Sequence, residues 1–246
     1  MKPPVNSPAY VLAFAAVVAT AFTAAIMTLH ALTAPAAERN ATLYEQRAVV
    51  EVFGLAAGRK LTDRQVLETY RRRIRPLSRR LADPQTGAVF NDPDGASART
   101  LVATTAPAGS GRAEVVGYAF PVWGVGFWAR IDGYLAVTPD LRRVIGIVFV
   151  RHSETPGLGG RLTEPAWRGR FAGLDVSAPR AGGKYIYIGG ERPGSPASDR
   201  HGRHVDAITG ATGTSAAVEK FLNERIEQFR RAAAGAPGAL GGAVDE

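Results

Sequence analysis

The sequence predicts an α+β protein in which a mostly antiparallel sheet is packed with helices and is preceded by one N-terminal transmembrane helix. Three observations support this fold class. Residues 10–32 form a long apolar stretch, residues 115–150 contain apolar, β-branched and aromatic runs, and residues 214–231 carry apolar side chains at helical spacing. Strands that follow one another before a closing helix are typical of the α+β class.

The apolar stretch from Tyr10 to Leu32 contains no Asp, Glu, Lys or Arg. At a rise of about 1.5 Å per residue, it is long enough to cross the roughly 30 Å of bilayer hydrocarbon. A secretory signal peptide is the alternative, with residues 34–36 (Ala-Pro-Ala) as a weak cleavage site. The hydrophobic region of a signal peptide is usually about 7–15 residues long. We therefore expect a retained anchor. Lys2 before the stretch favours a cytoplasmic amino terminus.

Two helices are expected between the anchor and the sheet. Residues 40–57 have apolar side chains at near-helical spacing and predict an amphipathic helix. Thr62 followed by Gln65 is a capping-box signature and predicts the start of a second helix. Pro76 is expected to end or kink that helix. Residues 83–112 are rich in Asp, Pro, Gly, Ala and Ser and predict a loop with at most one short strand.

The middle of the chain predicts the sheet. The strand-like runs are Val115–Val122, Phe127–Val137, Val144–Val150 and Tyr185–Ile188. Pro139-Asp140 predicts a hairpin between the second and third of these runs. The final helix, at 214–231, has an apolar stripe that faces the core.

Composition excludes several classes of chemistry. The chain has no cysteine, so it cannot form disulfides, attach a c-type haem or hold an iron–sulfur cluster on thiolates. Any redox chemistry must use an organic cofactor or a metal held by His and carboxylates. The net charge of +8 raises the question of nucleic-acid binding, but the arginines are spread along the chain and we expect no nucleic-acid partner. The cluster at 71–75, with Arg79 and Arg80, is either a solvated helix face or a docking surface for an acidic partner or lipid headgroups.

The first segment with a chemical signature lies directly before the final helix. Residues 206–212 read Asp-Ala-Ile-Thr-Gly-Ala-Thr. Small residues allow a ligand to approach the backbone, and a helix amino terminus favours a phosphate. Thr212 and Thr214 offer hydroxyl groups at this place. The alternative is an ordinary helix entry, with Thr214 or Ser215 as the N-cap.

The second segment, residues 152–160, reads His-Ser-Glu-Thr-Pro-Gly-Leu-Gly-Gly. Pro156-Gly157 suits the centre of a type II turn. Gly159 and Gly160 would let the backbone pack against a flat ring or a phosphate. Taken alone, this segment favours an ordinary tight loop between two elements.

Together the two segments resemble the FMN-binding subunit family of the Na+-translocating NADH:quinone reductase and Rnf complexes. Residues 206–212 match the family's flavinylation motif, Asp-x-x-Ser/Thr-Gly-Ala-Thr, and residues 154–159 match its second hallmark, Glu-Thr-Pro-Gly-Leu-Gly. Residues 124–141 and 164–167 look especially like the C subunit of the reductase, with the Rnf G subunit as the close alternative. Gly213 departs from the pattern, because a bulkier apolar residue is usual there.

The resemblance implies FMN bound covalently to Thr212 through a phosphoester. A flavin transferase would add it from FAD, and Asp206 would serve recognition or activation by that transferase. The residues implied to bind the cofactor are Thr212, Asp206, Thr209, Gly210, Ala211, Glu154, Thr155, Gly157, Leu158 and Gly159. No catalytic side chain and no metal ligand are expected. Trp123 and Trp128 are either core aromatics or stacking partners of the ring, and Lys184 is either exposed or faces a phosphate.

The implied function is that of an electron-transfer subunit in a sodium-transporting NADH:ubiquinone reductase, an oxidoreductase and translocase of the bacterial inner membrane. Its partners would be the other subunits, the transferase and membrane lipid. The alternatives are the Rnf G subunit, which serves electron transfer between ferredoxin and NAD, and a stand-alone extracytoplasmic FMN carrier. The expected organisation is a cytoplasmic segment at 1–9, one membrane span at 10–32, a periplasmic FMN-binding domain at 33–231 and a flexible tail at 232–246.

Two classes of function without a flavin also remain open. A hydrolase using His152, Asp206 and a serine would need a nucleophile such as that of Gly-x-Ser-x-Gly, which the sequence lacks. A non-redox binding module, in which the same loops grip a partner, would be colourless when purified.

Overall fold

The computed structural model describes residues 7–56, 58–77, 81–82, 84, 90, 100–105, 114–189, 202–235 and 240. The expectations for residues 1–6, for Arg79 and Arg80, for most of the 83–112 loop and for the end of the tail lie outside these residues. The chain forms two compact units, Met1–Tyr44 and Glu45–Glu246, which are described separately.

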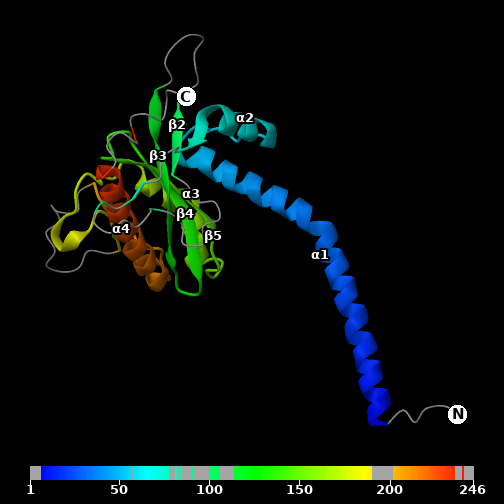
Figure 1. Cartoon of the computed structure of the whole chain (residues 1–246). Helices are drawn as coiled ribbons and strands as arrows, with labels where there is room; N and C mark the ends of the chain where they lie inside the picture. The colour runs from blue at the N-terminus through cyan, green and yellow to red at the C-terminus, as the bar shows by residue number, and fades with distance from the viewer. Residues whose placement is uncertain are drawn as a thin grey trace. The chain divides into compact units, whose positions relative to one another are not determined.

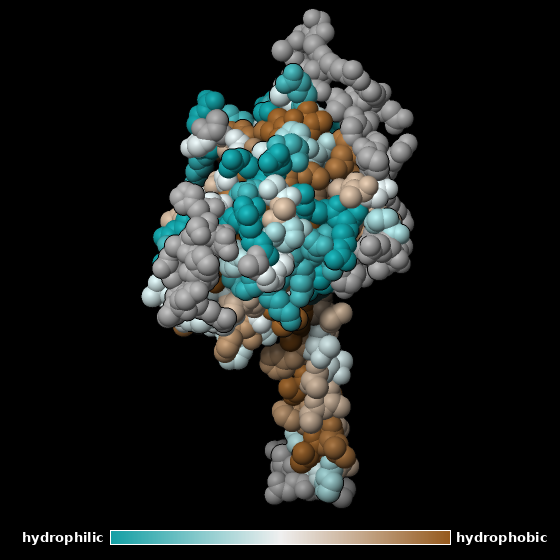
Figure 2. Space-filling model, turned by 90° about the vertical axis from the view of Figure 1, so that its left-hand side faces the viewer, coloured by the Kyte–Doolittle hydropathy of each residue, from teal (hydrophilic) through white to brown (hydrophobic). Residues whose placement is uncertain are grey.

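The first unit consists of the greater part of helix α1, which runs from Pro8 to Val52. Large apolar side chains between Tyr10 and Leu32 are exposed, and this surface is visibly hydrophobic (Figure 2). By length and composition α1 can cross a membrane, as the apolar stretch predicts. Pro35 lies inside the helix, where it removes one backbone hydrogen bond.

The last two turns of α1 belong to the second unit, where they form part of its core. Val49, Val50, Val52 and Phe53 are almost fully buried. Glu45 accepts a hydrogen bond from the Tyr134 hydroxyl at 2.7 Å. The amphipathic helix predicted over 40–57 is therefore confirmed up to Val52, and it is continuous with the apolar stretch.

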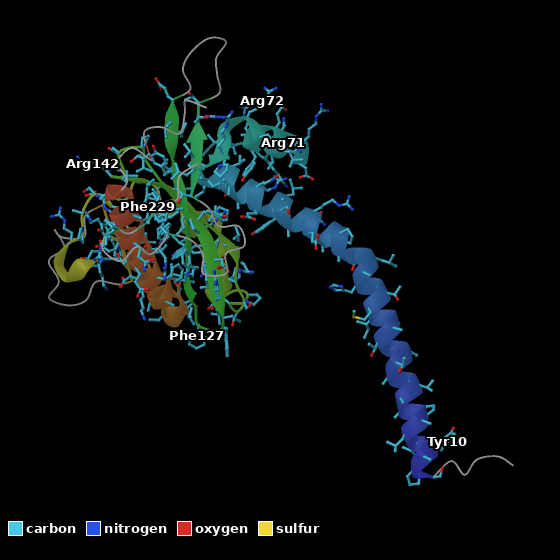
Figure 3. The ribbon with its side chains drawn as sticks, in the orientation of Figure 1. Tyr10, Arg71, Arg72, Phe127, Arg142 and Phe229 are labelled. Carbon is cyan, nitrogen blue, oxygen red and sulfur yellow. The ribbon has the colours of Figure 1, made fainter. Side chains whose placement is uncertain are left out.

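Helix α2, Asp63–Arg73, begins with the predicted capping box. The Thr62 hydroxyl accepts from the Gln65 amide, and the Gln65 side chain accepts from the Thr62 amide at 2.9 Å. The helix ends at Arg73, three residues before Pro76. The next three residues, Ile74–Pro76, form the short strand β1. β1 lies at the edge of the sheet, where the missing N–H of Pro76 breaks no central ladder. The arginines Arg71 and Arg72 are exposed on α2 (Figure 3).

A five-stranded antiparallel sheet has the order β1-β2-β3-β4-β5. Its remaining strands are β2 (Leu101–Thr104), β3 (Val115–Val125), β4 (Arg130–Val137) and β5 (Val144–Arg151). The predicted hairpin around Pro139-Asp140 connects β4 to β5. β4 begins three residues later than predicted, because Gly126 N–H donates to the Ala129 carbonyl and closes a turn there. The predicted α+β class is confirmed.

Helix α4, Thr212–Ala234, covers one face of this sheet (Figure 1). Phe229 lies between the helix and the strands (Figure 3), and its ring stacks on Phe120 with centroids 4.0 Å apart. The helix begins two residues before the predicted 214–231 segment and continues three residues beyond it. The third turn of the helix packs against the end of β3, where Gly124 lies directly beneath Phe221.

The end of α1 covers the opposite face. Along a strand, successive side chains point to opposite sides of the sheet. Phe120, which faces α4, pairs with Leu135 of β4, so the neighbouring Tyr134 faces the other way, toward Glu45. Gly146 of β5 also faces that side, and a Cβ there would lie 2.7 Å from the Val52 carbonyl oxygen. The sheet therefore lies between two helices.

Short elements connect β5 to α4. They are η1 (Gly159–Thr163), α3 (Pro165–Arg168), η2 (Gly169–Phe171), η3 (Ala181–Gly183) and a parallel pair of β6 (Tyr187–Ile188) with β7 (His204–Val205). Only half of the predicted strand at 185–188 is observed. The Tyr185 and Ile186 amides donate instead to the Asn223 side chain of α4, at 2.6 and 3.0 Å.

A buried arginine fixes this connecting region. Arg203 is only 2% exposed, and it donates to Asp175 at 2.5 Å and to the Ala178 carbonyl at 2.6 Å. Burial alone would raise the pKa of Asp175, but hydrogen bonds from Ser177 and the hydrogen bond and charge of Arg203 outweigh it and hold the pKa at about 2. The pair therefore stabilises the fold while Asp175 is ionised.

We expect Asp175→Asn to lower the free energy of unfolding at neutral pH by roughly 1–3 kcal/mol, because a buried guanidinium loses its charged acceptor. A depressed pKa contributes stability above the unfolded pKa of about 3.9, and this stability is lost as the pH falls toward about 2. The difference between variant and wild type in urea unfolding should therefore shrink in acid. Asp63→Asn, in an exposed pair with Arg47, should change stability by less than about 1 kcal/mol. If the difference in unfolding free energy between Asp175→Asn and the wild type stays constant with pH, this account is wrong.

We also expect the folded unit to require the end of α1. A chain that starts at residue 40 keeps the buried Val49, Val50, Val52 and Phe53, whereas one that starts at residue 55 loses them. Burial of each such side chain contributes roughly 1.5–3 kcal/mol, so the loss is comparable to the net stability of a domain, about 5–15 kcal/mol. Circular dichroism should show a cooperative thermal transition for the chain that starts at residue 40 and none for the chain that starts at residue 55. An equal transition in the shorter chain would refute this expectation.

Candidate functional site

The two segments singled out in the sequence meet at the amino terminus of α4. They line a pocket of about 200 Å³, together with the turn between β3 and β4. The lining residues are Phe127, Trp128, Glu154, Thr155, Leu158, Gly159, Gly210, Ala211, Thr212, Gly213 and Thr214. Phe127 marks this end of the sheet in Figure 3. Three regions far apart in the sequence therefore form one site.

The loop after β5 contains the predicted type II turn. Leu158 N–H donates to the Thr155 carbonyl at 3.1 Å, and Gly157 has φ +75°. Only glycine adopts this conformation without strain at the third position of the turn. The turn is confirmed, and it presents Thr155 and Leu158 at the pocket.

Glu154 holds the three parts of the site together. Its side chain is 4% exposed. One carboxylate oxygen accepts from the backbone amides of Phe127 and Trp128, at 2.9 and 3.1 Å. The other accepts from the Thr214 hydroxyl at 2.5 Å. The carboxylate thus connects the β3–β4 turn, its own loop and the first turn of α4.

Two glycines leave room for this carboxylate. A Cβ on Gly126 would lie 2.5 Å from one Glu154 oxygen, and a Cβ on Gly159 would lie 2.6 Å from the other. The Gly159 Cβ would also lie 2.6 Å from the Thr214 hydroxyl oxygen. Gly159 was expected to let the backbone approach a ligand. The structure shows that it also admits Glu154.

The start of α4 differs from the predicted helix entry. Ala211 occupies the N-cap position and makes no side-chain cap. The Ser215 hydroxyl accepts from the Ile208 amide and donates to the Ala211 carbonyl, so neither Thr214 nor Ser215 is the N-cap. Thr212 is the first helical residue and is exposed, whereas Thr214 is buried. Within the described part of the chain, the Thr212 hydroxyl makes no hydrogen bond.

Two exposed aromatic side chains form the rim of the pocket. Phe127 is 63% exposed and Trp128 is 67% exposed, with ring centroids 5.2 Å apart. The Trp128 indole N–H donates to the Thr155 hydroxyl at 3.0 Å. Gly213, where the sequence departs from the family pattern, lies next to this rim, and a Cβ there would lie 2.7 Å from the Phe127 ring.

The other two side chains considered for the cofactor lie elsewhere. Trp123 is buried, with the Arg225 guanidinium 4.1 Å above its ring, and so it is a core aromatic. Lys184 pairs with Glu219 of α4 at 2.5 Å. Neither lines the pocket.

Three contributors to the site were not predicted from the sequence. They are Gly126, Phe127 and the hydrogen bond of Thr214 to Glu154. Two glycines flanking apolar and aromatic residues between strand-like runs, at 124–128, were the available signal for the first two.

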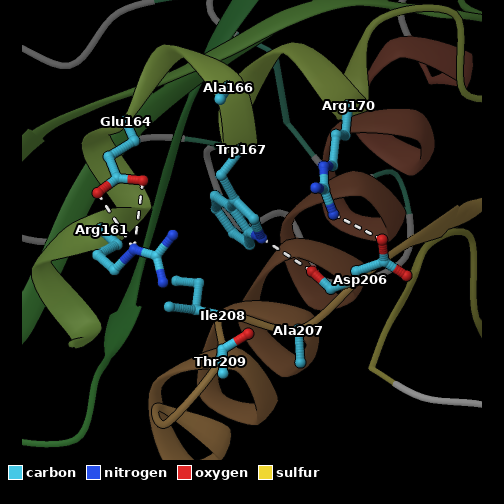
Figure 4. Close-up of a pocket in the computed structure, with 9 residues that line it drawn as sticks. All are labelled: Arg161, Glu164, Ala166, Trp167, Arg170, Asp206, Ala207, Ile208 and Thr209. Atoms are coloured by element: carbon cyan, nitrogen blue, oxygen red, sulfur yellow. Dashed lines mark hydrogen bonds and ion pairs between the residues drawn. The ribbon is translucent and has the colours of Figure 1, made fainter. Parts of the chain in front are cut away.

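The remaining part of the first segment lines a second pocket, of about 330 Å³ (Figure 4). Asp206 and Thr209 lie here and not in the first pocket. The Asp206 carboxylate accepts from Arg170 at 2.6 Å, and its carbonyl accepts from the Trp167 indole N–H at 2.9 Å. On the other side, Arg161 pairs with Glu164 at 3.1 Å. Residues 206–212 thus divide between two faces of one loop.

The geometry gives no support to a hydrolase. His152 accepts a hydrogen bond from the Glu154 amide at 3.2 Å, and Asp206 pairs with Arg170. The buried Ser215 hydroxyl is engaged with backbone groups. Among the described residues these three side chains form no hydrogen-bonded series.

An aromatic rim, a glycine-containing loop and a free hydroxyl at a helix amino terminus define a site suited to a phosphate-bearing planar cofactor. A family model described as "FMN-binding domain" matches residues 126–227, which include both segments. The chain is 30% identical to the C subunit of the Na(+)-translocating NADH-quinone reductase of Vibrio parahaemolyticus over 211 residues, 73% of this chain and 76% of that protein. It is 37% identical to the corresponding C subunit of Pasteurella multocida over 106 residues, which are 43% of this chain and 38% of that protein.

The fold agrees with these matches. The crystal structure of Shewanella oneidensis NqrC covers 81% of this chain and 97% of its own, with a TM-score of 0.53 and 22% identity. The C subunit from Parabacteroides distasonis covers 81% and 94%, with a TM-score of 0.52 and 20% identity. The protein is thus an FMN-binding-domain protein with an apolar N-terminal helix. It belongs to the family of C subunits of the Na(+)-translocating NADH-quinone reductase, an oxidoreductase complex. The alternatives, the Rnf G subunit and a stand-alone carrier, are not favoured.

We expect Gly159→Ala to destabilise the site, because the new methyl group would collide with the Glu154 carboxylate and the Thr214 hydroxyl. Overpacking of this kind costs roughly 1–3 kcal/mol, which a thermal melt should show as a lower melting temperature. Gly169→Ala is the matched control, since no atom lies within 4 Å of its Cβ position and its φ is −60°. Equal melting temperatures for the two variants would contradict the packing argument.

Proposed function

We propose that this chain carries FMN as a phosphoester on the Thr212 hydroxyl and exchanges electrons through it. The observation that carries the proposal is the position of this hydroxyl. It is exposed, it stands at the amino terminus of α4, and it borders the pocket with the aromatic rim. Attachment forms the bond from the Thr212 oxygen to the FMN phosphorus, breaks the pyrophosphate bond of FAD and releases AMP and a proton.

The residues at the site suit the parts of the cofactor. The amides of the first turn of α4 and the positive end of its dipole favour the phosphate. Gly210, with φ +79°, and Ala211 give it a close approach to the backbone. Thr155, Gly157, Leu158 and Gly159 would contact the isoalloxazine or the ribityl chain. Glu154 would bind the cofactor only indirectly, since both its oxygens already accept protein hydrogen bonds.

The size of the pocket supports an electron-transfer role. At about 200 Å³ it is smaller than the roughly 300–1,000 Å³ of pockets that enclose a ligand of this size. Part of the flavin would therefore remain at the surface, where a redox partner can reach it. FMN supplies the redox chemistry, and the protein holds and orients it.

The remaining parts of the proposal concern the partners. A flavin transferase would recognise Asp206 and Thr209, which face the second pocket and leave the first pocket free for the flavin. The electron partners would be other subunits of a sodium-transporting NADH:ubiquinone reductase. Helix α1 would anchor the chain in the bacterial inner membrane among lipids, with the FMN-binding domain on the periplasmic side.

We expect Thr212→Ala, co-expressed with the flavin transferase, to lose all covalent flavin. On a denaturing gel under ultraviolet light, the wild type should fluoresce and the variant should not. Thr214→Val is the matched control, because it removes a hydroxyl from the same helical turn. That hydroxyl is buried and donates to Glu154, and it is not the proposed site of FMN attachment. Fluorescence in Thr212→Ala, or its loss from Thr214→Val alone, would disprove the assignment. A colourless wild type would favour the non-redox binding module.

A further inference from the structure

Among the described residues that line the first pocket, Glu154 is the one charged side chain. Proteins rarely bury a carboxylate to this degree unless it is paired or hydrogen-bonded. Within the described residues, no lysine or arginine forms an ion pair with it, and its partners are two backbone amides and one hydroxyl. The site therefore contains a buried acidic group whose charge is not cancelled by a cation.

Three donors are directed at this carboxylate. Both oxygens accept hydrogen bonds, and the two amides at 2.9 and 3.1 Å are donors only. The Thr214 hydroxyl donates to the other oxygen at 2.5 Å. Donors directed at a carboxylate stabilise its negative charge. A neutral side chain would hold the three segments together with a similar shape, so the charge needs a separate explanation.

We propose that the Glu154 carboxylate sets the reduction potential of the flavin held in this pocket by placing a buried negative charge against it. This inference rests on the proposed function, since it requires FMN at the site. In this role Glu154 acts through the electric field of its negative charge, and it does not touch the reacting atoms of the flavin.

The sign of the effect follows from charge balance. A reduction by two electrons that takes up one proton from water adds one negative charge at the pocket. A fixed negative charge nearby opposes that addition, and in a protein interior it is screened less than in water. Glu154 should therefore lower the reduction potential and favour the oxidised flavin. The amino terminus of α4 has the opposite sign, so the two features act against each other.

The test is Glu154→Gln in the full-length chain, co-expressed with the transferase. Glutamine preserves the shape of the side chain and can still accept from the two amides, but it removes the charge. In the flavin-loaded fraction of the variant, we expect a midpoint potential that rises by about 30 mV or more in a spectroelectrochemical titration. About 30 mV corresponds to a tenfold change in the equilibrium constant of a two-electron couple. An unchanged potential in a flavin-loaded variant would overturn the inference.

Two further variants separate charge from structure. Glu164→Gln neutralises a half-buried glutamate ten residues away, which pairs with Arg161 and lines the second pocket. The flavin in this variant should have the same reduction potential as in the wild type. Thr214→Val leaves the Glu154 charge in place and removes one of the donors that offset it. The reduction potential of the flavin should therefore fall. A higher reduction potential in Thr214→Val, or equal increases in Glu154→Gln and Glu164→Gln, would show that the charge of Glu154 does not set the potential.

The outcomes also separate this inference from the proposed function. Absence of covalent flavin from the wild type overturns both. Flavin present in the wild type, with the same potential in Glu154→Gln, overturns the inference alone. If Glu154→Gln does not fold, as judged by its thermal melt, the direction of the shift in Thr214→Val decides the question.

Discussion

The site depends on the buried carboxylate of Glu154. Its three donors come from two segments that the sequence separates from it widely, the β3–β4 turn and the first turn of α4. Loops do not normally converge in this way unless polar groups at the meeting point satisfy one another, because each unpaired buried group would cost about 1–3 kcal/mol. Gly126 and Gly159 belong to the same constraint, since a side chain at either would occupy the space of the carboxylate. The pocket exists because these groups are mutually satisfied.

The scaffold makes this convergence possible by fixing the direction of α4. The stacked rings of Phe120 and Phe229 and the contact of Phe221 over Gly124 hold the helix along β3. Its amino terminus must then lie beside the turn at which β3 ends. On the opposite face, the end of α1 supports the sheet through Val52 and Glu45. Since both faces are covered, the strands and the helix can hold the site rigidly, while most of the residues that line the pocket lie on loops and turns.

Much of this fold could be predicted from local sequence signals. The capping box at Thr62, the turn at Pro156-Gly157 and the β4–β5 hairpin depend on neighbouring residues and are observed as predicted. The failures involve distant partners. Tyr185 has the character of a strand residue, but its amide is taken by Asn223 of α4. The same applies to Glu154: its type and position were evident, whereas its bonds to Phe127 and Thr214 depend on tertiary packing that no local pattern encodes.

The difference between Thr212 and Thr214 shows how the helix selects one of two identical side chains. Residues two apart on an α-helix are separated by roughly 200° around its axis, so when one faces the core the other faces outward. Glu154 and the β3–β4 turn fix which face is inward, and Thr214 is therefore buried while Thr212 is exposed. The small residues before the helix are compatible with several starting points for it. An N-cap at Thr214 or Ser215 would have started the helix later and changed which of the two threonines faces the core. The buried acid thus determines both the shape of the pocket and which hydroxyl stands at its mouth.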